Sequence, residues 1–337
     1  MATIKDIAQV AGVSKAAVSY AFNGSNKISE TTREKILKIA SELNYTPNRN
    51  AQRLRAKQTK RIGLFLPFFS GSYYMYLCES IFRMLQLSEY KLEIYASSVN
   101  TVSEQIAEVI GAGIDAAIVQ YSFHSSSDFD KFISATQKSG IPVVCLTNDR
   151  VFDKCSCVVM DNERCLSQTV DYLIETGHRK IMYFGNGLNY DESKRFLGFS
   201  KAMTRHDLTP MHMEFLGTDP CEWAGYQTIH DKFPQLTEIP DAICCENDLL
   251  AIGCIRALRS FGYKIPNDIS ITGFDNLIPS QLFDTKLTTV KNPIERIGRL
   301  AAEEALRLID DEAKGKIIVV DSELVKGETV AVRSIKE

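Results

Sequence analysis

From residue 61 onward the sequence alternates short apolar runs with segments of helical composition, and this alternation constrains the fold more than any other feature. The apolar runs have five or six residues and cover residues 62–67, 92–97, 116–121, 142–146, 180–185, 213–217, 241–245 and 269–274. The intervening stretches that suit helices are residues 74–88, 102–111, 127–138, 162–176, 192–206, 223–232 and 247–261. Short buried strands separated by helices predict an α/β fold with parallel sheets covered by helices on both faces.

Eight strands are too many for one compact unit of this length, so we predict two subdomains. A break near residues 158–162 leaves four predicted strands on each side. Ligands of open parallel sheets bind beyond the carboxyl ends of the strands. The predicted small-molecule site is therefore a cleft between the two subdomains.

The N-terminal residues 3–23 predict two short helices joined by a tight turn. Thr3 and Ser14 are placed to cap these helices, and Gly12 lies where the chain reverses. A third helix beginning near Ser29 can close a small core over the pair. The pair alone is equally compatible with a helix-turn-helix that enters the major groove of DNA and with an ordinary helical hairpin.

Charge is distributed unevenly along the chain. Residues 1–60 carry eleven Lys and Arg against four Asp and Glu, about +7, whereas the whole chain carries −3, so the remainder carries −10. A basic head on an acidic body indicates a polyanionic partner. The basic connector at residues 48–60 has one large apolar side chain, Leu54. It is either a solvated linker or a segment that folds on meeting a partner, and a leucine among arginines favours the second.

The sequence offers no catalytic signature. The motifs GxGxxG, GxxxxGKS/T, GxSxG and HExxH are absent, the five histidines lack triad or metal spacing, and the nine cysteines form no CxxC pair. We therefore predict that the chain is not an enzyme, binds no metal or cofactor, and keeps its thiols reduced and mostly buried. No apolar run approaches the ~20 residues that span a membrane and no signal-peptide core is present, so we expect no membrane partner and a cytoplasmic location.

Polar and aromatic residues gather at the predicted junctions between strands and helices. They are Tyr73, Tyr74, Asn148, Asp149, Arg150, Arg195, Asn247, Asp248 and Asp275. Rings that stack and fixed polar groups that orient suit a sugar or another small polar ligand. For each residue alone, a role in a turn or a helix cap is as compatible as ligand contact. Asp248 in particular is predicted to cap the helix that follows it.

Taken together, these segments resemble the LacI/GalR-type transcriptional regulators over essentially all 337 residues. The N-terminal motifs are TIKDIAQVAGVSKAAVSYAFNG (3–24) and ISETTREKILKIASELNYTPN (28–48). The later motifs are GHRKI (177–181), RFLGF (195–199), NDLLAIG (247–253), IPNDISITGFDN (265–276) and LTTV (287–290). Each motif alone is weak, but their order and spacing together are specific.

The resemblance implies a small all-α helix-turn-helix headpiece followed by two Rossmann-like parallel-sheet subdomains of the periplasmic-binding-protein type I kind. The expected headpiece is residues 1–46, the hinge helix residues 47–60 and the core residues 61–337. Within the core, the N-subdomain is expected at about 61–160 plus 291–322, and the C-subdomain at about 161–290 plus 323–337. The chain would then pass between the subdomains three times.

The resemblance also implies a DNA-binding repressor. It would act as a nucleoid-associated homodimer on double-stranded, pseudo-palindromic operator DNA, under the control of a small effector such as a sugar or nucleobase in the cleft. The positions implied for DNA contact are Thr3, Ser14, Lys15, Ala16, Tyr20, Asn23, Leu54 and Arg55. The positions implied at or near the effector are Tyr73, Tyr74, Asn148, Arg195, Trp223, Asn247 and Asp275.

The implied DNA contacts divide by chemistry. Lys15 can donate to guanine, and Ala16 offers a methyl group to thymine, so these side chains with Tyr20 would select bases. Thr3, Ser14 and Asn23 match phosphate contacts, which hold the protein in register. The resemblance makes Leu54 a wedge in the minor groove, which explains an apolar side chain on a basic helix.

Three positions depart from the family pattern. Gln52 and Ala17 replace a common arginine and threonine, which predicts a slightly weaker grip on the DNA backbone. Thr147 replaces a frequent aspartate beside the cleft and leaves the effector class open. Two alternatives to the effector-controlled repressor are a solute-binding protein without DNA function and a regulator controlled by a protein co-regulator.

Overall fold

The computed structural model describes residues 3–22, 27–43, 45, 58–67, 69, 71–97, 99, 101–123, 125–187, 189–217, 221–277, 285–310 and 312–333. The chain divides into two compact units, Met1–Thr59 and Lys60–Glu337.

The first unit contains three helices, α1 (Ile4–Ala11), α2 (Lys15–Phe22) and α3 (Glu30–Glu42). One apolar side chain from each helix, Ile7, Val18 and Ile36, is fully buried in their shared core. The predicted caps are confirmed. Thr3 and Asp6 form a capping box on α1, and Ser14 Oγ accepts from the Ala17 amide at 3.1 Å. Gly12 ends α1 at φ 67°, a left-handed conformation that glycine adopts without a steric penalty.

The second unit is built on two six-stranded sheets. The first sheet has the order β11-β5-β4-β3-β1-β2, and all of its strand pairs are parallel. Its strands are β1 (Arg61–Leu66), β2 (Lys91–Ala96), β3 (Ala116–Val119), β4 (Val143–Cys145), β5 (Cys155–Met160) and β11 (Ile317–Val320). We call this sheet and its helices the first half.

The second sheet has the order β12-β10-β9-β8-β6-β7 and is parallel except for the antiparallel pair β10–β12. Its strands are β6 (Ile181–Phe184), β7 (Met211–Met213), β8 (Ala242–Cys245), β9 (Ser270–Asp275), β10 (Thr288–Lys291) and β12 (Glu323–Val325). We call this sheet and its helices the second half. The chain passes between the halves after β5, after β10 and after β11, so the connection between them is threefold.

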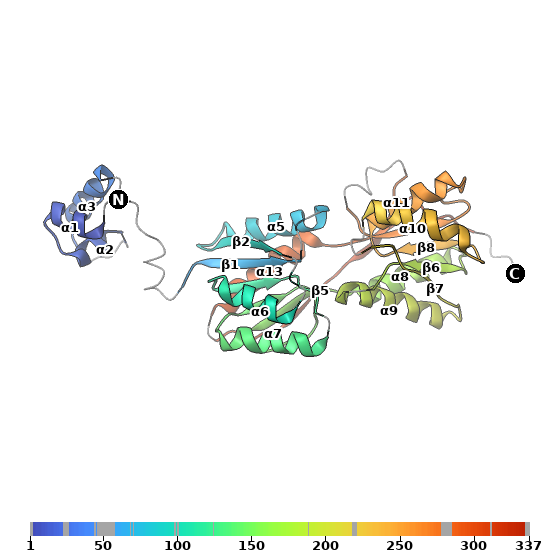
Figure 1. The fold of residues 1–337 in the computed structure, drawn as a ribbon, viewed down its shortest axis with the longest axis horizontal. Coiled ribbons are helices and arrows are strands. Elements are labelled where there is room, and N and C mark those ends of the chain that lie inside the picture. The colour runs from blue at the N-terminus through green and yellow to red at the C-terminus, as the bar shows by residue number, and fades with distance from the viewer. Residues whose placement is uncertain are drawn as a thin grey trace. The chain divides into compact units, whose positions relative to one another are not determined.

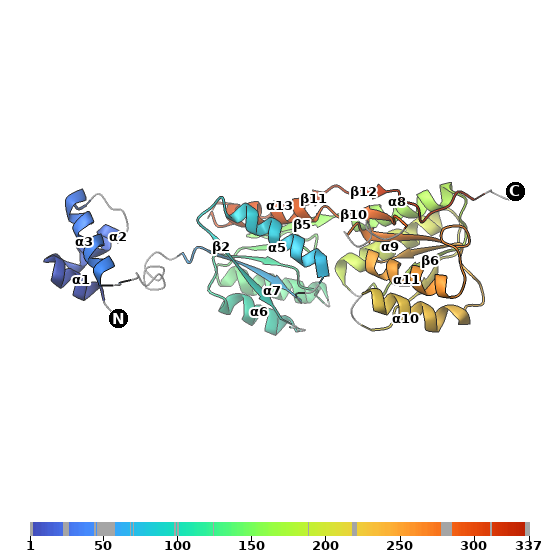
Figure 2. The ribbon, with the colours of Figure 1, turned by 90° about the horizontal axis from the view of Figure 1, so that it is seen from above.

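Helices cover both faces of each sheet (Figures 1 and 2). In the first half, α5 (Gly71–Leu85) and α13 (Ile294–Leu308) lie on one face, and α6 (Val102–Gly111) and α7 (Ser126–Lys138) lie on the other. In the second half, α8 (Asn162–Glu175) and α9 (Tyr190–Arg205) oppose α10 (Glu222–Lys232), the 3-10 turn η1 (Phe233–Gln235) and α11 (Asp248–Ser260). The two layers of helices bury the central strands β1, β3, β4, β6, β8 and β9, whereas β2 and β7, at the sheet edges, are partly exposed.

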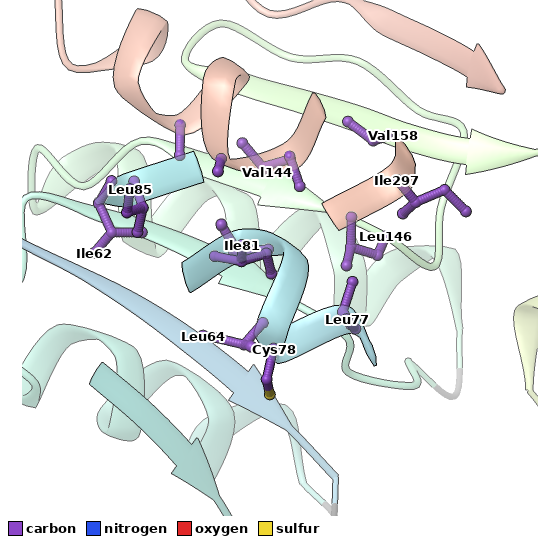
Figure 3. Packing of buried hydrophobic residues seen from close by; sticks show 14 of the residues in the cluster. Ile62, Leu64, Leu77, Cys78, Ile81, Leu85, Val144, Leu146, Val158 and Ile297 are labelled. Carbon is purple, nitrogen blue, oxygen red and sulfur yellow. The ribbon is translucent and has the colours of Figure 1, made fainter. Parts of the chain in front are cut away.

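Figure 3 shows the packing under α5, where Leu77, Ile81 and Leu85 point toward the sheet and toward α13. These three side chains have the helical spacing of one apolar face. Beneath them lie Leu64 of β1 and Val144 of β4, which are fully buried. The apolar face of α5 thus fixes the helix whose first turn carries Tyr73 and Tyr74.

The structure has more strands than the eight predicted. The chain leaves the first half after Met160, within the predicted break near residues 158–162, but the predicted division into four strands on each side is wrong, because β5 directly before the break was missed. Its sequence, CSCVVM, mixes thiols and a hydroxyl into the apolar run and leads into α8 without a glycine or proline to mark a turn. β11 and β12 were also missed, because their side chains are largely exposed and give a weak apolar signal. β10 was missed because its sequence is rich in threonine, and β7 begins two residues earlier than predicted.

All nine cysteines are free, as predicted, and all except Cys221 are buried. Among the described residues, no group of three or more His, Cys, Asp or Glu side chains could hold a metal ion. Within the same part of the chain, no helix has the length and apolarity needed to cross a membrane.

Candidate DNA-binding and effector sites

Helix α2 presents the residues predicted to select bases. Lys15 and Ala16 are exposed, while Val18 on the opposite side is fully buried in the three-helix core. Tyr20 is half-buried, and the Lys27 ammonium lies 5.3 Å from the centre of its ring. The buried anchor and the exposed basic and small side chains give α2 the two faces that a recognition helix needs.

The predicted phosphate contacts in this unit lie at helix N-termini. Thr3 precedes α1, and Ser14 precedes α2 and accepts from the Ala17 amide. Helix N-termini carry a partial positive charge and unsatisfied amides, which favours phosphate nearby. The other predicted DNA contacts, Asn23, Leu54 and Arg55, lie outside the described residues.

In the second unit the predicted effector residues centre on Arg195 of α9, whose side chain is 9% exposed. Its Nε donates to Asn162 Oδ1 at 3.0 Å and its Nη1 donates to the Glu246 carbonyl oxygen at 2.8 Å. Its Nη2 lies 3.7 Å from Asp275 Oδ1, and its guanidinium carbon lies 3.8 Å from the centre of the Phe274 ring. The structure therefore brings two predicted residues, Arg195 and Asp275, into one ion pair.

Asp275 occupies an unusual backbone position at the end of β9. Its φ is 99° and that of Asn276 is 52°, so two consecutive non-glycine residues lie in the left-handed region. Such strain concentrates at binding sites, where the surrounding fold maintains it. Asn292 Nδ2 donates to Asp275 Oδ1 at 3.0 Å, while the buried Asn292 Oδ1 has no hydrogen-bond partner among the described residues.

Tyr73 and Tyr74 approach this group from α5 in the first half. Their rings meet edge to face, with centroids 5.2 Å apart. Burial first, and then the charge of Asp191, raise the pKa of Tyr73 above its ordinary value, and Asp275 and Arg195 also act on its hydroxyl. Tyr73 of one half therefore faces the charged residues of the other.

Three further first-half residues at the strand ends, Asn148, Thr147 and Gln120, are neutral. Asn148 is buried after β4, and its Oδ1 accepts from the Arg150 amide at 3.0 Å, which is a turn contact. Thr147 Oγ1 donates to the Tyr121 carbonyl oxygen at 2.5 Å. Gln120, which follows β3 directly, is 8% exposed, and its Oε1 has no hydrogen-bond partner in the part of the chain that the structure describes. Sequence reasoning missed Gln120 and Asn292, because each ends or follows a strand without a motif of its own.

Two buried acids beside Arg195 were also missed. Burial is the main cause that raises the pKa of Asp191 to about 6, although Arg195 opposes it, and Asn162 Nδ2 donates to its Oδ1 at 2.8 Å. Burial likewise raises the pKa of Glu246 to about 7, while the Gly187 amide donates to its carboxylate at 3.1 Å. Perturbed acids of this kind cluster at functional sites. Position alone could have indicated them, since Asp191 lies in the first turn of α9 and Glu246 directly follows β8.

The prediction that Asp248 caps α11 is wrong. Asn247 has extended backbone, at φ −148° and ψ 173°, and its Oδ1 accepts from the Leu250 amide at 2.8 Å, so Asn247 is the cap. Asp248 is already the first helical residue, and a cap must lie outside the helix. Asp248 is fully buried and instead accepts from the Leu277 amide at 2.7 Å and from Thr289 Oγ1 at 2.5 Å.

Trp223 lies elsewhere. It is 65% exposed on α10 and stacks on Tyr226 with ring centroids 5.8 Å apart. The stack continues through His230 to Phe261. None of the contacts among the described residues joins Trp223 to the group around Arg195.

A separate hollow of about 490 Å³ lies between α5 and α13. Its lining is largely charged and includes Glu79, Arg83, Arg296 and Arg299. It contains none of the predicted effector residues, so the two features are distinct.

Two protein-family models match the chain. One, described as bacterial regulatory proteins of the lacI family, matches residues 3–48, and the other, a periplasmic binding protein-like domain, matches residues 170–330. The chain is 32% identical over 335 residues to the probable HTH-type transcriptional repressor ExuR of Bacillus subtilis (strain 168). This match covers 98% of each protein. It is also 28% identical over 321 residues to catabolite control protein A of Priestia megaterium, a match that covers 94% of this chain and 95% of that protein.

Solved structures show the same architecture. The lac repressor bound to ONPG in its repressed state is 25% identical and superposes with a TM-score of 0.86 over 98% of this chain and 99% of that one. The transcriptional regulator CelR in complex with cellobiose is 22% identical, with a TM-score of 0.69 over 98% of this chain and 100% of that one. The second likeness shows the fold alone.

Proposed function

Since the chain belongs to the lacI family of bacterial regulatory proteins, we propose that it is a transcriptional repressor whose grip on operator DNA is controlled by a small polar effector. The observation that carries the proposal is the exposed face of α2, where Lys15 and Ala16 lie opposite the buried Val18. A solute-binding protein without DNA function has no use for such a helix on a segment of about +7 charge.

In this proposal α2 of each copy in a homodimer reads one half-site, and the half-sites lie about one helical turn of DNA apart or a multiple of it. Lys15 donates to a guanine, Ala16 contacts a thymine methyl group, and Tyr20 contacts a base edge or phosphate. Thr3, Ser14 and Asn23 hold the register on phosphates. Leu54, with Arg55 beside it, would wedge into the minor groove between the half-sites.

The proposed effector site combines the predicted residues Tyr73, Tyr74, Asn148, Arg195 and Asp275. The unpartnered side-chain oxygens of Gln120 and Asn292 extend it, since buried acceptors of this kind are completed by a ligand that donates hydrogen bonds. Asn247 keeps its place at the start of α11 as a helix cap that borders the site.

The hydroxyl groups of a sugar match these acceptors, and the two tyrosine rings can stack on its apolar face. Two similar regulators were solved with sugars: CelR with cellobiose, and a LacI family regulator from Enterococcus faecium with ribose. Other relatives are repressors named PurR, so nucleobases are the second class of ligand to compare with sugars. Trp223 would reach the effector only if α10 moved, because it now faces solvent.

The remaining parts of the proposal concern organisation. A headpiece at residues 1–46, a hinge at 47–60 and a core at 61–337 agree with the division into units at residue 59. We expect the protein to act in the cytoplasm, where operator DNA is accessible, and to have no enzymatic activity.

A competition gel shift tests the DNA-binding part. Full-length protein is titrated onto the duplex upstream of its own gene and onto a shuffled duplex of equal composition, at fixed salt because phosphate contacts make affinity salt-dependent. Lys15→Ala should relax the preference at one base pair by about 1–3 kcal/mol while leaving shuffled binding unchanged. Lys38→Ala, which removes an exposed charge of α3, is the matched control. Equal binding to every duplex by the native protein would refute sequence-specific repression.

The hinge is tested in the same assay. Leu54→Ala should weaken binding to the upstream duplex far more than binding to the shuffled one, because only a specific complex kinks its DNA around a wedge. An unchanged ratio of the two affinities would remove Leu54 from the interface.

A further inference from the structure

One polar cluster joins the two halves of the second unit at the predicted cleft. Asp149 lies in the loop after β4 in the first half, and Tyr190 and Lys194 lie in the first turn and a half of α9 in the second half. Lys194 Nζ lies 3.4 Å from Asp149 Oδ2, and the Tyr190 hydroxyl donates a hydrogen bond to the same carboxylate. Lys194 Nζ also lies 5.3 Å from the centre of the Tyr190 ring, so the three side chains contact one another.

The electrostatics of this cluster favour an ionised Asp149. Burial alone would raise its pKa, but the hydrogen bond from Tyr190 and the charge of Lys194 together lower it below its ordinary value. Burial first, and then the hydrogen bond to Asp149, raise the pKa of Tyr190, so its hydroxyl keeps its proton. A charged acceptor with a neutral donor is the strong form of a hydrogen bond.

The other contact across the cleft is apolar. Leu277 after β9 is buried in the cluster that contains Leu77 of α5, and Leu249 of α11 packs against the same cluster beside Tyr73 and Tyr74. This contact involves the strands β1, β8 and β9, whereas the polar cluster lies where β4 and β6 end. Among the described residues, the halves therefore have an apolar contact near Tyr73 and Tyr74 and a polar contact at Asp149.

We propose that Asp149, Tyr190 and Lys194 form a latch that holds the two halves closed and sets how readily the cleft opens. Every group in the latch belongs to the protein. The free energy by which the latch stabilises the closed form therefore adds to the free energy that a bound effector supplies. A ligand shifts an equilibrium between open and closed forms only by its differential affinity for them. The latch sets how large this differential affinity must be to close the cleft. The more the closed form is already populated, the less binding free energy an effector spends on closure.

The latch goes beyond the proposed function and is tested without DNA or effector. Small-angle X-ray scattering of the full-length protein measures the radius of gyration for the native chain and for Asp149→Ala, Tyr190→Phe and Lys194→Gln. Asp149→Ala should shift the ratio of open to closed core about tenfold, the size of a lost charge-assisted hydrogen bond, and should raise the radius of gyration. Tyr190→Phe should raise the radius of gyration almost as much as Asp149→Ala. Lys194→Gln should raise it least, because the ion pair between Lys194 and Asp149 is partly exposed and therefore weak.

Glu163→Gln is the matched control. Glu163 pairs with Lys201 of α9 at 2.6 Å, but both residues belong to the second half, so this ion pair involves the same helix without crossing the cleft. An increase in radius in the three latch variants but not in Glu163→Gln, at unchanged unfolding temperature, supports the latch. Equal radii in all five proteins, or an equal increase in the control, would overturn it.

Should Asp149→Ala fold poorly, Tyr190→Phe decides the question, because it removes one hydroxyl and keeps the ring. A native radius in correctly folded Tyr190→Phe and Lys194→Gln would also overturn the proposal.

Discussion

The two walls of the cleft differ in kind. To the proposed effector site the first half contributes the neutral side chains Tyr73, Tyr74, Asn148 and Gln120, whereas the second contributes Arg195 in contact with carboxylates. The charged Asp149 of the first half belongs to the latch instead. On the charged wall, Arg195 is held by fixed partners, as its contacts with Asn162 and Glu246 show, although the Asn292 oxygen lacks a partner among the described residues. On the neutral wall, the Gln120 oxygen lacks a partner among the described residues.

This difference assigns the walls different tasks. A preorganised charged network orients a polar ligand without further rearrangement, because its geometry is already fixed when the ligand arrives. A neutral wall with aromatic rings can close over the ligand at a low desolvation cost. The comparison predicts that substitutions on the charged wall change stability and pH dependence as well as ligand binding, whereas substitutions on the neutral wall change ligand binding with little effect on stability.

The largest expected effect is that of Arg195→Ala. It leaves Asp191, Asp275 and Glu246 without their buried cation, and removing one partner of a buried ion network costs about 3–5 kcal/mol. Urea unfolding at pH 7.5 measures the loss. Arg195→Lys should recover only part of it, because an ammonium group cannot make the two-sided contact of the guanidinium.

The matched substitution on the neutral wall is Tyr73→Phe, which should cost less than about 1 kcal/mol in the same assay. If Tyr73→Phe proved as costly as Arg195→Ala, the two walls would not differ as described.

The second prediction concerns the pH dependence of stability. Burial raises the pKa of Asp191 from 3.8 to about 6, so the folded chain binds this proton more tightly than the unfolded chain. Its contribution therefore favours folding at low pH and is lost as pH rises from 3.8 to about 6. Asp191→Asn removes this titrating group. The free energy of unfolding should then vary less with pH over that interval, by roughly 1–3 kcal/mol for a side chain that is partly exposed. Unfolding free energies measured from pH 4 to pH 8 check it.

Glu163→Gln is the control for that profile, since Glu163 pairs with Lys201 and is not among the groups that act on the pKa of Asp191. The same slope in native and Asp191→Asn proteins would show that Asp191 does not titrate in this interval.

A smaller effect is expected at Gln120 on the neutral wall. Gln120→Ala removes a buried acceptor that has no described partner, so stability should change by less than about 1 kcal/mol. Binding of any sugar identified by a thermal-shift screen should nevertheless weaken about tenfold, because one hydrogen bond to the ligand is lost. Calorimetry with that sugar measures the change, and unaltered affinity would place Gln120 outside the site.

Local features were predictable from sequence, and long-range ones were not. Thr3, Gly12 and Ser14 act on amides within a few residues, so their caps follow from spacing alone. The pairing of Arg195 with Asp275 joins α9 to β9 and was not predicted, because the family resemblance placed each residue at the effector site without pairing them.

Asp191 and Glu246 were missed because an acid in the first helical turn or at a strand end is ordinary until the fold buries it. The misplaced cap at Asp248 has the opposite cause. Its carboxylate is engaged by Thr289 and by the Leu277 amide, which are distant in sequence, while its neighbour Asn247 takes the local role.

The central claim is that a ligand in the cleft controls DNA binding by this chain. Fluorescence anisotropy of the full-length protein on its upstream duplex, with and without each member of a panel of pentoses, hexoses, disaccharides and nucleobases, tests it most directly. We predict that one compound changes the affinity of the native protein at least tenfold and leaves Arg195→Ala, which still binds the duplex, unaffected. An equal response of Arg195→Ala to that compound would contradict the account.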